Sequence, residues 1–220
     1  MNCNSKMRIY DRREAIIFRK TNELFGGLSN MAAGYRLRIN NIEILTSEAL
    51  YQACRFPHMP EVQQLILGQL SPMTAKMKSK PYRKHTRADW DSVKVKIMRW
   101  CLRLKLAQNR RKFADLLIST NSKDIVEESK RDNFWGAKPK GDFILEGENI
   151  LGRLLMELRE ELTNKKIEGL LIVEPPDILD FMILEEHIGL IRIKRDDLDL
   201  PLHEPSHPLL SCKSQLTLFE

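Results

Sequence analysis

Three clusters of polar residues hold the side chains of this sequence most able to do chemistry. The first joins Leu28-Ser29-Asn30 to the segment TSEALYQA at 46–53. The second is DIVEESKRDNFWG at 124–136, and the third is GENILGRLLMELR at 147–159. Together they offer carboxylates, amides and a tryptophan, a combination that suits acid–base catalysis on a polar substrate.

Two acids in these clusters suit opposite roles. Glu48 lies in the first turn of an expected helix, where the helix dipole favours a negative charge, so it suits a base or a stabiliser of a cation. Asp132 lies in a loop beside Phe134-Trp135, and partial burial there would suit it to protonating a leaving group. Simpler interpretations remain open, since Glu is common at helix ends and Asp commonly caps loops.

Common nucleotide and metal fingerprints are absent from the sequence. It contains no GxGxxG, P-loop, GxSxG or HExxH motif, which speaks against hydride transfer, phosphoryl transfer and zinc hydrolysis. His203 and His207 have ligand-like spacing, but they sit in a proline-rich, acidic tail. We therefore expect no metal and no cofactor.

The elements that must position these residues predict a helix-rich α+β fold. Residues 15–45 alternate like short strands, with a hairpin around Asn40-Asn41. Thr46 is expected to cap the helix that carries Glu48, and Asp89 to cap a longer helix. The apolar side of that longer helix is formed by Val93, Ile97, Trp100, Cys101, Leu104 and Ala107. A last helix is expected from about residue 148 to 162.

The chain divides by character into four parts. Residues 1–14 form an N-terminal segment, 15–163 the main domain, 164–200 a small β-prone appendage, and 201–220 an extended tail. In the appendage, DFMILEEH and IGLIRIK are expected to pair around Glu186-His187. We find no internal repeat.

Charge is unevenly distributed along a chain whose net charge is +6. Residues 71–113 hold 14 Lys or Arg against 2 Asp, whereas 168–220 hold 4 Lys or Arg against 11 acids. The basic middle suits a polyanion such as DNA, or a pyrophosphate, although a solvated helix face has the same composition.

Compartment signals favour the cytoplasm. No apolar run approaches the roughly 20 residues that span a bilayer, and the first residues do not resemble a secretory signal. Four scattered cysteines form no CxxC pair, which favours a reducing compartment over a disulfide framework.

An ordered set of short motifs over residues 15–162 resembles the pattern of the NADAR family. The matching positions are Phe18, Leu28-Ser29-Asn30, Thr46, Glu48, Tyr51-Gln52-Ala53, Ala75-Lys76, Trp90, Val95, Met98, Lys105, Gln108-Asn109, Leu116-Leu117, Thr120, Val126-Glu127, Asp132, Trp135-Gly136, Gly147, Asn149, Leu151-Gly152, Leu155-Met156 and Arg159. Many members have Lys where this chain has Arg55. The loop AKPKGDFILEGEN after Trp135-Gly136 resembles the branch encoded beside DarT-type toxins, which ADP-ribosylate guanine in DNA.

The resemblance implies an N-glycoside hydrolase that cleaves between the anomeric carbon of a ribose and an exocyclic amine of a base. Its implied catalytic residues are Glu48, Lys76 and Asp132, with Lys76 as an amine that forms an imine with the opened sugar. Direct attack by water remains the alternative. The implied substrate-binding residues are Ser29, Asn30, Tyr51, Glu127, Trp135, Gly136, Gly147, Asn149 and Arg159.

Several of these binding roles have structural alternatives. Trp135 could stack on a base or pack in the core. Gly147 to Asn149 precede the last helix, where free backbone amides could hold a pyrophosphate, or they could form a turn. Ser29 and Asn30 could bond ribose hydroxyls or cap their own turn.

The function expected first is removal of ADP-ribose from guanine in single-stranded DNA, as the antitoxin of a DarT-type toxin. The alternatives are a glycosidase that clears riboflavin-biosynthesis intermediates, and a catalytically silent module that binds ADP-ribose, DNA or the toxin. The tail Gln215–Phe219 resembles a motif by which bacterial proteins dock on the sliding clamp, although it could instead fold back as a terminal strand.

Overall fold

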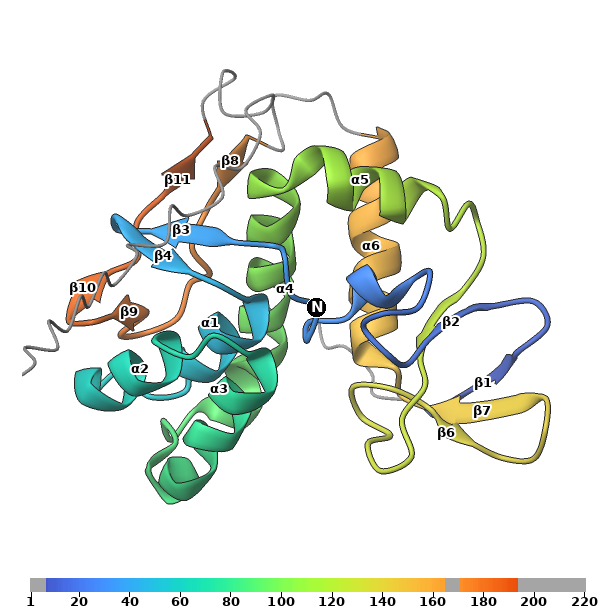
Figure 1. Cartoon of the computed structure of the whole chain (residues 1–220), viewed down its shortest axis with the longest axis horizontal. Helices are drawn as coiled ribbons and strands as arrows, with labels where there is room; N and C mark the ends of the chain where they lie inside the picture. Colours follow the sequence, from blue (N-terminus) through green and yellow to red (C-terminus); the bar gives the residue numbers. More distant parts are fainter. Residues whose placement is uncertain (1–6, 165–170, 194–220) are drawn as a thin grey trace, which may run out of the picture.

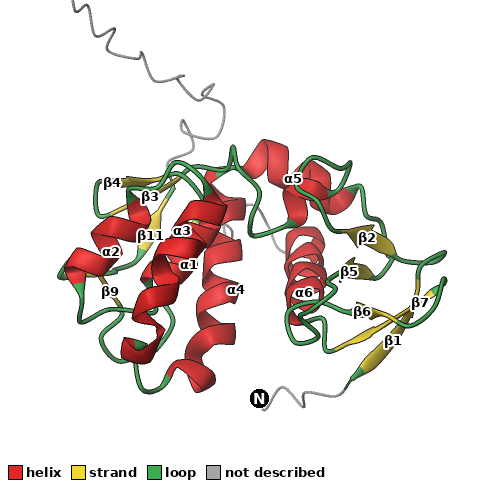
Figure 2. Ribbon diagram, turned by 60° about the horizontal axis from the view of Figure 1, so that its bottom comes forward, coloured by secondary structure: helices red, strands yellow, loops and turns green. Residues whose placement is uncertain are grey.

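A long central helix, α4, separates two groups of elements in the computed structural model, which describes residues 7–164 and 171–193 (Figure 1). Helices α1 to α3, the hairpin at 37–44 and the strands between residues 172 and 192 lie on one side (Figure 1 and Figure 2). Helices α5 and α6 and the strands within residues 8–18 and 125–147 lie on the other (Figure 2). The helices are α1 (Ser47–Ala53), α2 (Pro60–Leu67), α3 (Pro72–Ser79), α4 (Trp90–Gln108), α5 (Arg110–Ile118) and α6 (Ile150–Asn164), with 3-10 turns η1 (Gly26–Leu28) and η2 (Lys80–His85).

The strands form several small sheets. The pairs β3 (Leu37–Ile39) with β4 (Ile42–Ile44), β8 (Ile172–Val173) with β11 (Ile191–Arg192), and β9 (Met182–Ile183) with β10 (Glu186–His187) are antiparallel. Strand β2 (Ile16–Phe18) runs parallel to β5 (Ile125–Glu127), and β1 (Arg8–Asp11), β7 (Ile144–Gly147) and β6 (Lys138–Pro139) form a three-stranded sheet. The α+β class predicted from the sequence is therefore confirmed.

Local signals in the sequence account for the start of the site-bearing helix. Asn40 and Asn41 take φ angles of 47° and 65°, the left-handed pair that a two-residue hairpin needs. Thr46 then caps α1 by accepting a hydrogen bond from the Ala49 N–H at 3.2 Å. Asp89 precedes α4, but its side chain bonds to Arg87 and makes no capping bond. Asp89 is therefore the N-cap residue, as predicted, but its side chain pairs with Arg87 instead of capping the helix.

Helix α4 packs its apolar side into the core as its spacing predicts. The six predicted core residues are all buried: Val93, Ile97, Trp100, Cys101, Leu104 and Ala107. Helix α6 packs against α4, α5 and β5, so it ties the two groups of elements together. The last predicted helix thus exists, two residues later than expected at each end.

The C-terminal extension packs on the main domain. The Phe181 ring meets Trp100 of α4 edge-on at 4.8 Å, and Gln63 of α2 bonds to the backbone of Met182 and Leu184. The predicted pairing of DFMILEEH with IGLIRIK is wrong. Residues 191–192 pair with β8 instead, and the β9–β10 turn lies at Leu184-Glu185, where both φ angles are positive.

Other expectations concern cysteines, membranes and the tail. Cys54 and Cys101 are buried free thiols, while Cys3 and Cys212 lie outside the described residues. Within residues 7–164 and 171–193, none of the helices combines the length and apolar character that crossing a bilayer requires. The segment Gln215–Phe219 and the histidines His203 and His207 also lie outside the described residues.

Candidate active site

Glu48 is the central side chain of the candidate site. It lies in the first turn of α1 and is 4% exposed. Its Oε2 accepts a hydrogen bond from Asn30 Nδ2 at 2.7 Å, and its Oε1 accepts one from Gln52 Nε2 at 2.9 Å. Gln52 is itself held by the Ser79 hydroxyl, which donates to its Oε1 at 3.0 Å. These amides fix the carboxylate in one orientation.

Lys76 stands next to this carboxylate. Its Nζ lies 4.0 Å from Glu48 Oε1, and its side chain is 43% exposed. Helix α3 packs closely on α1, which sets this distance. The structure therefore brings together the predicted amine and one predicted acid, with the amine on the solvent side.

Glu127 lies near enough to Glu48 and Lys76 for its carboxyl group to be affected by both of their charges. It ends β5 and is partly buried. Burial raises its pKa to about 7, and the negative charges of Asp132 and Glu48 add to this effect, while Lys76 opposes it. A carboxyl group that titrates near neutrality can hold a proton for a leaving amine.

Asp132 is placed differently from the partly buried acid expected. It is exposed, and its Oδ1 accepts hydrogen bonds from the backbone N–H groups of Phe134 and Trp135 at 3.0 and 2.9 Å. This is the loop-capping geometry of an Asx turn. Burial by aromatic residues, on which its assignment as the acid rested, is not observed, and Glu127 is the more buried of the two acids.

Aromatic rings line the cluster. Tyr51 of α1 meets Trp90 at 5.2 Å and meets Trp135 edge-on at 5.7 Å. Phe134 packs edge-on against Trp135, and both rings are partly exposed. A partly exposed indole beside the carboxylates can stack on a base, while its edge contact with Tyr51 also serves packing.

The backbone N–H groups just before α6 and in its first turn bond to the loop at 133–136, so they are not free to bind a ligand. The N–H groups of Glu148 and Asn149 bond to Asn133 O and Gly136 O at 2.7 and 3.1 Å. Those of Ile150 and Leu151 bond to the carbonyls of Phe134 and Trp135. The expected pyrophosphate seat on amides at Gly147–Asn149 is therefore incorrect for Glu148 and Asn149, because these donors already have partners.

Asn149 and two glycines support Glu127 from behind. The fully buried Asn149 side chain accepts from the Glu127 N–H at 3.1 Å and donates to Ile125 O at 2.8 Å. A Cβ at Gly136 would lie 2.4 Å from Glu127 O, and one at Gly147 would lie 2.3 Å from Gly136 O. These residues act through backbone packing, and only glycine allows so close an approach.

Ser29 and Arg159 also make structural contacts. Ser29 Oγ accepts from the Met31 N–H at 3.1 Å, which caps its own turn. Arg159 Nη1 donates to Thr120 Oγ1 at 2.7 Å and to Lys123 O at 2.9 Å. Arg159 thus ties α6 to the chain that follows α5, whereas Asn30 reaches the cluster directly.

Lys105 is among the positions that match the family pattern, but the sequence alone assigns it no role in the site. It is fully buried, and its Nζ donates to Gly27 O at 2.7 Å and Ser29 O at 3.1 Å. Burial lowers its pKa well below the usual range, and Lys112 adds to this. Lys105 lies four residues after Cys101, on the buried side of α4, and this spacing was the available signal. It holds the η1 loop that presents Asn30 to Glu48.

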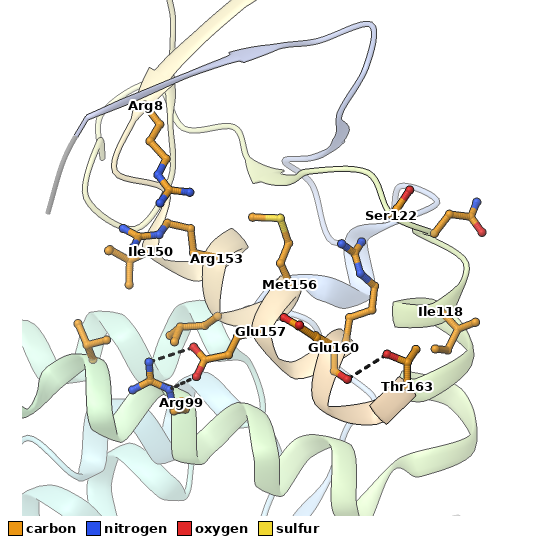
Figure 3. A pocket seen from close by; sticks show the side chains of 14 residues that line it. Arg8, Arg99, Ile118, Ser122, Ile150, Arg153, Met156, Glu157, Glu160 and Thr163 are labelled. Atoms are coloured by element: carbon orange, nitrogen blue, oxygen red, sulfur yellow. Dashed lines mark hydrogen bonds and ion pairs between the residues drawn. The ribbon is translucent and has the colours of Figure 1, made fainter. Parts of the chain in front are cut away.

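Two open cavities lie apart from the charged cluster. One of about 730 Å³ follows α6, with Arg8, Arg99 and Arg153 among its lining residues (Figure 3). The other, of about 830 Å³, lies between η2 and the C-terminal extension. Neither is lined by Glu48, Lys76 or Glu127. Among the described residues, no group of three or more His, Cys, Asp or Glu could hold a metal.

Comparison with known proteins decides the family. The model of the NADAR domain matches residues 17–163. The chain belongs to the NADAR family. N-glycosidase YbiA of Escherichia coli (strain K12) is 34% identical over 154 residues, which cover 69% of this chain and 90% of that protein. The NMR structure of E. coli YbiA superposes with a TM-score of 0.59, covering 68% of this chain and 86% of that one.

Another relative carries a different kind of name. A riboflavin biosynthesis protein of Vibrio vulnificus is 36% identical over 117 residues, which cover 53% of this chain and 30% of that protein. The NADAR match ends at residue 163, so the extension at 171–193 lies beyond it.

Proposed function

We propose that this NADAR-family N-glycosidase removes ADP-ribose from guanine bases of single-stranded DNA. The bond cleaved joins the anomeric carbon of the ribose to the exocyclic amine of the base. Its cleavage needs a negative group near the anomeric carbon and a proton for the departing amine. In this role the enzyme acts in the cytoplasm as the antitoxin of a DarT-type ADP-ribosyltransferase.

The convergence of Glu48, Lys76 and Glu127 carries the proposal. Glu48, oriented by two amides, stabilises positive charge at the anomeric carbon or activates water. Glu127, with a pKa raised to about 7, supplies the proton. Lys76 lies close enough to Glu48 to attack the opened sugar at the same carbon. Asp132 supports both through the Trp135 loop.

Exposed cations beside the site favour a polyanionic substrate. Lys78, Lys80, Arg83 and Lys84 follow Lys76 along α3 and η2, and all four are exposed. Within the described part of the chain, none has a carboxylate within ion-pair distance. In α4, by contrast, Arg99 pairs with Glu157 at 3.0 Å. The exposed cations that follow Lys76 are therefore free to meet phosphates beside the catalytic cluster.

A second candidate substrate is an aminopyrimidine intermediate of riboflavin synthesis. The name of the Vibrio relative favours this substrate. The intermediate contains the same type of bond between ribose and an exocyclic amine. A binding module without catalysis is the third possibility. The converging catalytic groups argue against it.

The decisive experiment compares the two substrates. Purified protein is incubated with ADP-ribosylated single-stranded DNA and, separately, with the ribosylated aminopyrimidine, and released sugar is measured by chromatography. We expect ADP-ribose from the DNA at the higher kcat/KM, and none with Glu48→Gln. Faster cleavage of the aminopyrimidine would establish the second candidate, and binding without release would establish the third.

A further inference from the structure

Arg55 lies just past the C-terminal end of α1, on the same side of the helix as Glu48. Glu48, Gln52 and Arg55 are spaced four and three residues apart, and Cys54 keeps helical backbone angles after the helix ends at Ala53. Seven residues of helix separate the Cα atoms of Glu48 and Arg55 by about 10 Å. Arg55 is therefore suited to hold a part of the substrate remote from the reacting carbon.

The guanidinium of Arg55 is fixed in place but has unused hydrogen-bonding capacity. It lies over the Trp90 ring, 4.2 Å from the centroid, and its Nε is buried without a hydrogen-bond partner. No carboxylate among the described residues lies within ion-pair distance of it. A partly desolvated guanidinium with a free donor gains most from an anionic ligand.

Arg83 brings a second positive charge to the same place. The η2 turn runs alongside residues 55–56, since Tyr82 packs edge-on against Phe56 at 6.5 Å and the Arg87 N–H donates to Arg55 O at 3.0 Å. Burial lowers the pKa of Arg55, and the charge of Arg83 lowers it further, whereas Glu48 and Asp91 raise it. Neither arginine forms an ion pair with a described acid, and two unpaired cations held together are a common arrangement for binding phosphate.

We propose that Arg55, assisted by Arg83, binds a phosphate group on the ribose C5′ side of the substrate. The proposal rests on the proposed function, because ADP-ribose carries a diphosphate at that carbon. Trp90 holds the guanidinium plane, and the two terminal nitrogens of the guanidinium donate to phosphate oxygens. This subsite replaces the amides before α6, which the Trp135 loop already occupies.

Calorimetric titration of the full chain tests the subsite without relying on turnover. Wild type, Arg55→Ala, Arg83→Ala and the control Arg111→Ala, an exposed arginine of α5, are titrated with ADP-ribose, ribose 5-phosphate and adenosine. We expect Arg55→Ala to weaken ADP-ribose binding about 10- to 100-fold and Arg83→Ala about 3- to 10-fold. Arg111→Ala should have no effect, and adenosine should bind all variants alike. A parallel loss for ribose 5-phosphate assigns the subsite to the phosphate nearest the ribose, and a loss for ADP-ribose alone assigns it to the outer one.

Other outcomes would overturn the proposal. Unchanged ADP-ribose affinity in Arg55→Ala would do so, as would an equal loss of ADP-ribose affinity in Arg83→Ala and Arg111→Ala. A loss of adenosine affinity in Arg55→Ala equal to its loss of ADP-ribose affinity would also do so. So would the absence of ADP-ribose and ribose 5-phosphate binding by wild type. Should thermal melting show that Arg55→Ala does not fold, Arg83→Ala and Arg55→Lys decide in its place. If phosphate binding behaves as expected but ADP-ribosylated DNA is not cleaved, the subsite stands and the proposed function fails.

Discussion

At the residue scale, the acids Asp132 and Glu127 have different roles: Asp132 is structural, and Glu127 is the proposed proton donor. Asp132 uses its carboxylate to hold the backbone of the Trp135 loop, and it is exposed. Glu127 is partly buried close to Glu48. The sequence contains both acids but does not indicate which of them is buried, because burial depends on how β5 packs against the Trp135 loop. The assignment of Glu127 as the acid therefore needed the structure.

The titration of Glu127 predicts a pH dependence. Its protonated form predominates below a pKa of about 7, so a role as general acid requires the rate to be constant below this value and to fall above it. We expect kcat at pH 8 to be about tenfold below the plateau. Glu127→Gln should lower kcat by about 10²- to 10⁴-fold and abolish this limb. A pH–rate profile of both proteins measures it, and persistence of the same limb in Glu127→Gln would assign the proton to another group.

Glu48→Gln should abolish turnover and leave the fold intact. The change removes the charge and keeps the volume, and the one remaining amide oxygen can still accept a hydrogen bond from Asn30 or from Gln52. We expect kcat to fall by at least about 10³-fold, since the developing cation is no longer stabilised. Circular dichroism and ADP-ribose binding serve as controls for folding. Wild-type activity in this variant would contradict the role of Glu48.

Lys76 distinguishes the covalent route from direct attack by water. If its amine forms an imine with the opened sugar, borohydride added during turnover should trap a sugar adduct on the wild-type chain. We expect mass spectrometry to place this adduct on Lys76, and Lys76→Ala to show neither adduct nor turnover. Lys78→Ala, an exposed lysine of the same helix, is the matched control. Absence of an adduct together with full activity in Lys76→Ala would establish attack by water.

At the element scale, turns, caps and helix faces within one segment could be predicted from the sequence. Contacts between segments that are distant in the sequence could not. The Asn40-Asn41 turn, the Thr46 cap and the apolar side of α4 depend on neighbouring residues, and all three appear as expected. The pairing of β8 with β11 joins segments that are separate in the chain, and the sequence pattern selected the wrong partner. The contact of Lys105 with η1 likewise depends on tertiary packing.

The junction of α6 with β5 gives a prediction at this scale. Gly152→Ala should stabilise an isolated helix by about 1 kcal/mol. Here, however, a Cβ at this position would lie 2.0 Å from Ile125 O and 2.5 Å from the Asn149 side chain. We expect a net decrease of about 2 to 4 kcal/mol in the free energy of unfolding, measured by urea denaturation. Gly189→Ala, where a Cβ would meet nothing within 4 Å, is the control and should change stability little.

At the scale of the whole molecule, the structure narrows the surface that could meet DNA. Charge counting along residues 71–113 treats all basic residues alike. In three dimensions, Lys105 is fully buried, and Arg87 is buried and bonded to Asp89 and Leu179 O. Arg99 and Arg103 join α4 to α6 through Glu157 and Glu161. Lys96 of α4 and Arg111 and Lys112 of α5 are also exposed and have no ion pair among the described residues. The exposed cations of α3 and η2 follow Lys76 directly in the chain, so they are the candidate surface beside the site.

Charge reversal on η2 tests this surface. Lys80→Glu combined with Lys84→Glu changes two exposed residues that have no ion pair in the described structure, so folding should be unaffected. We expect weaker binding of ADP-ribosylated single-stranded DNA and a log–log salt slope flatter by about 0.7 for each phosphate that is no longer bound. Hydrolysis of a single ADP-ribosylated guanosine, which has no flanking strand, should be unchanged. The same reversal at Arg111 and Lys112 of α5 is the control, since these residues lie outside α3 and η2. Equal DNA affinity for both double variants and wild type would mean that the cations of η2 form only a solvated surface.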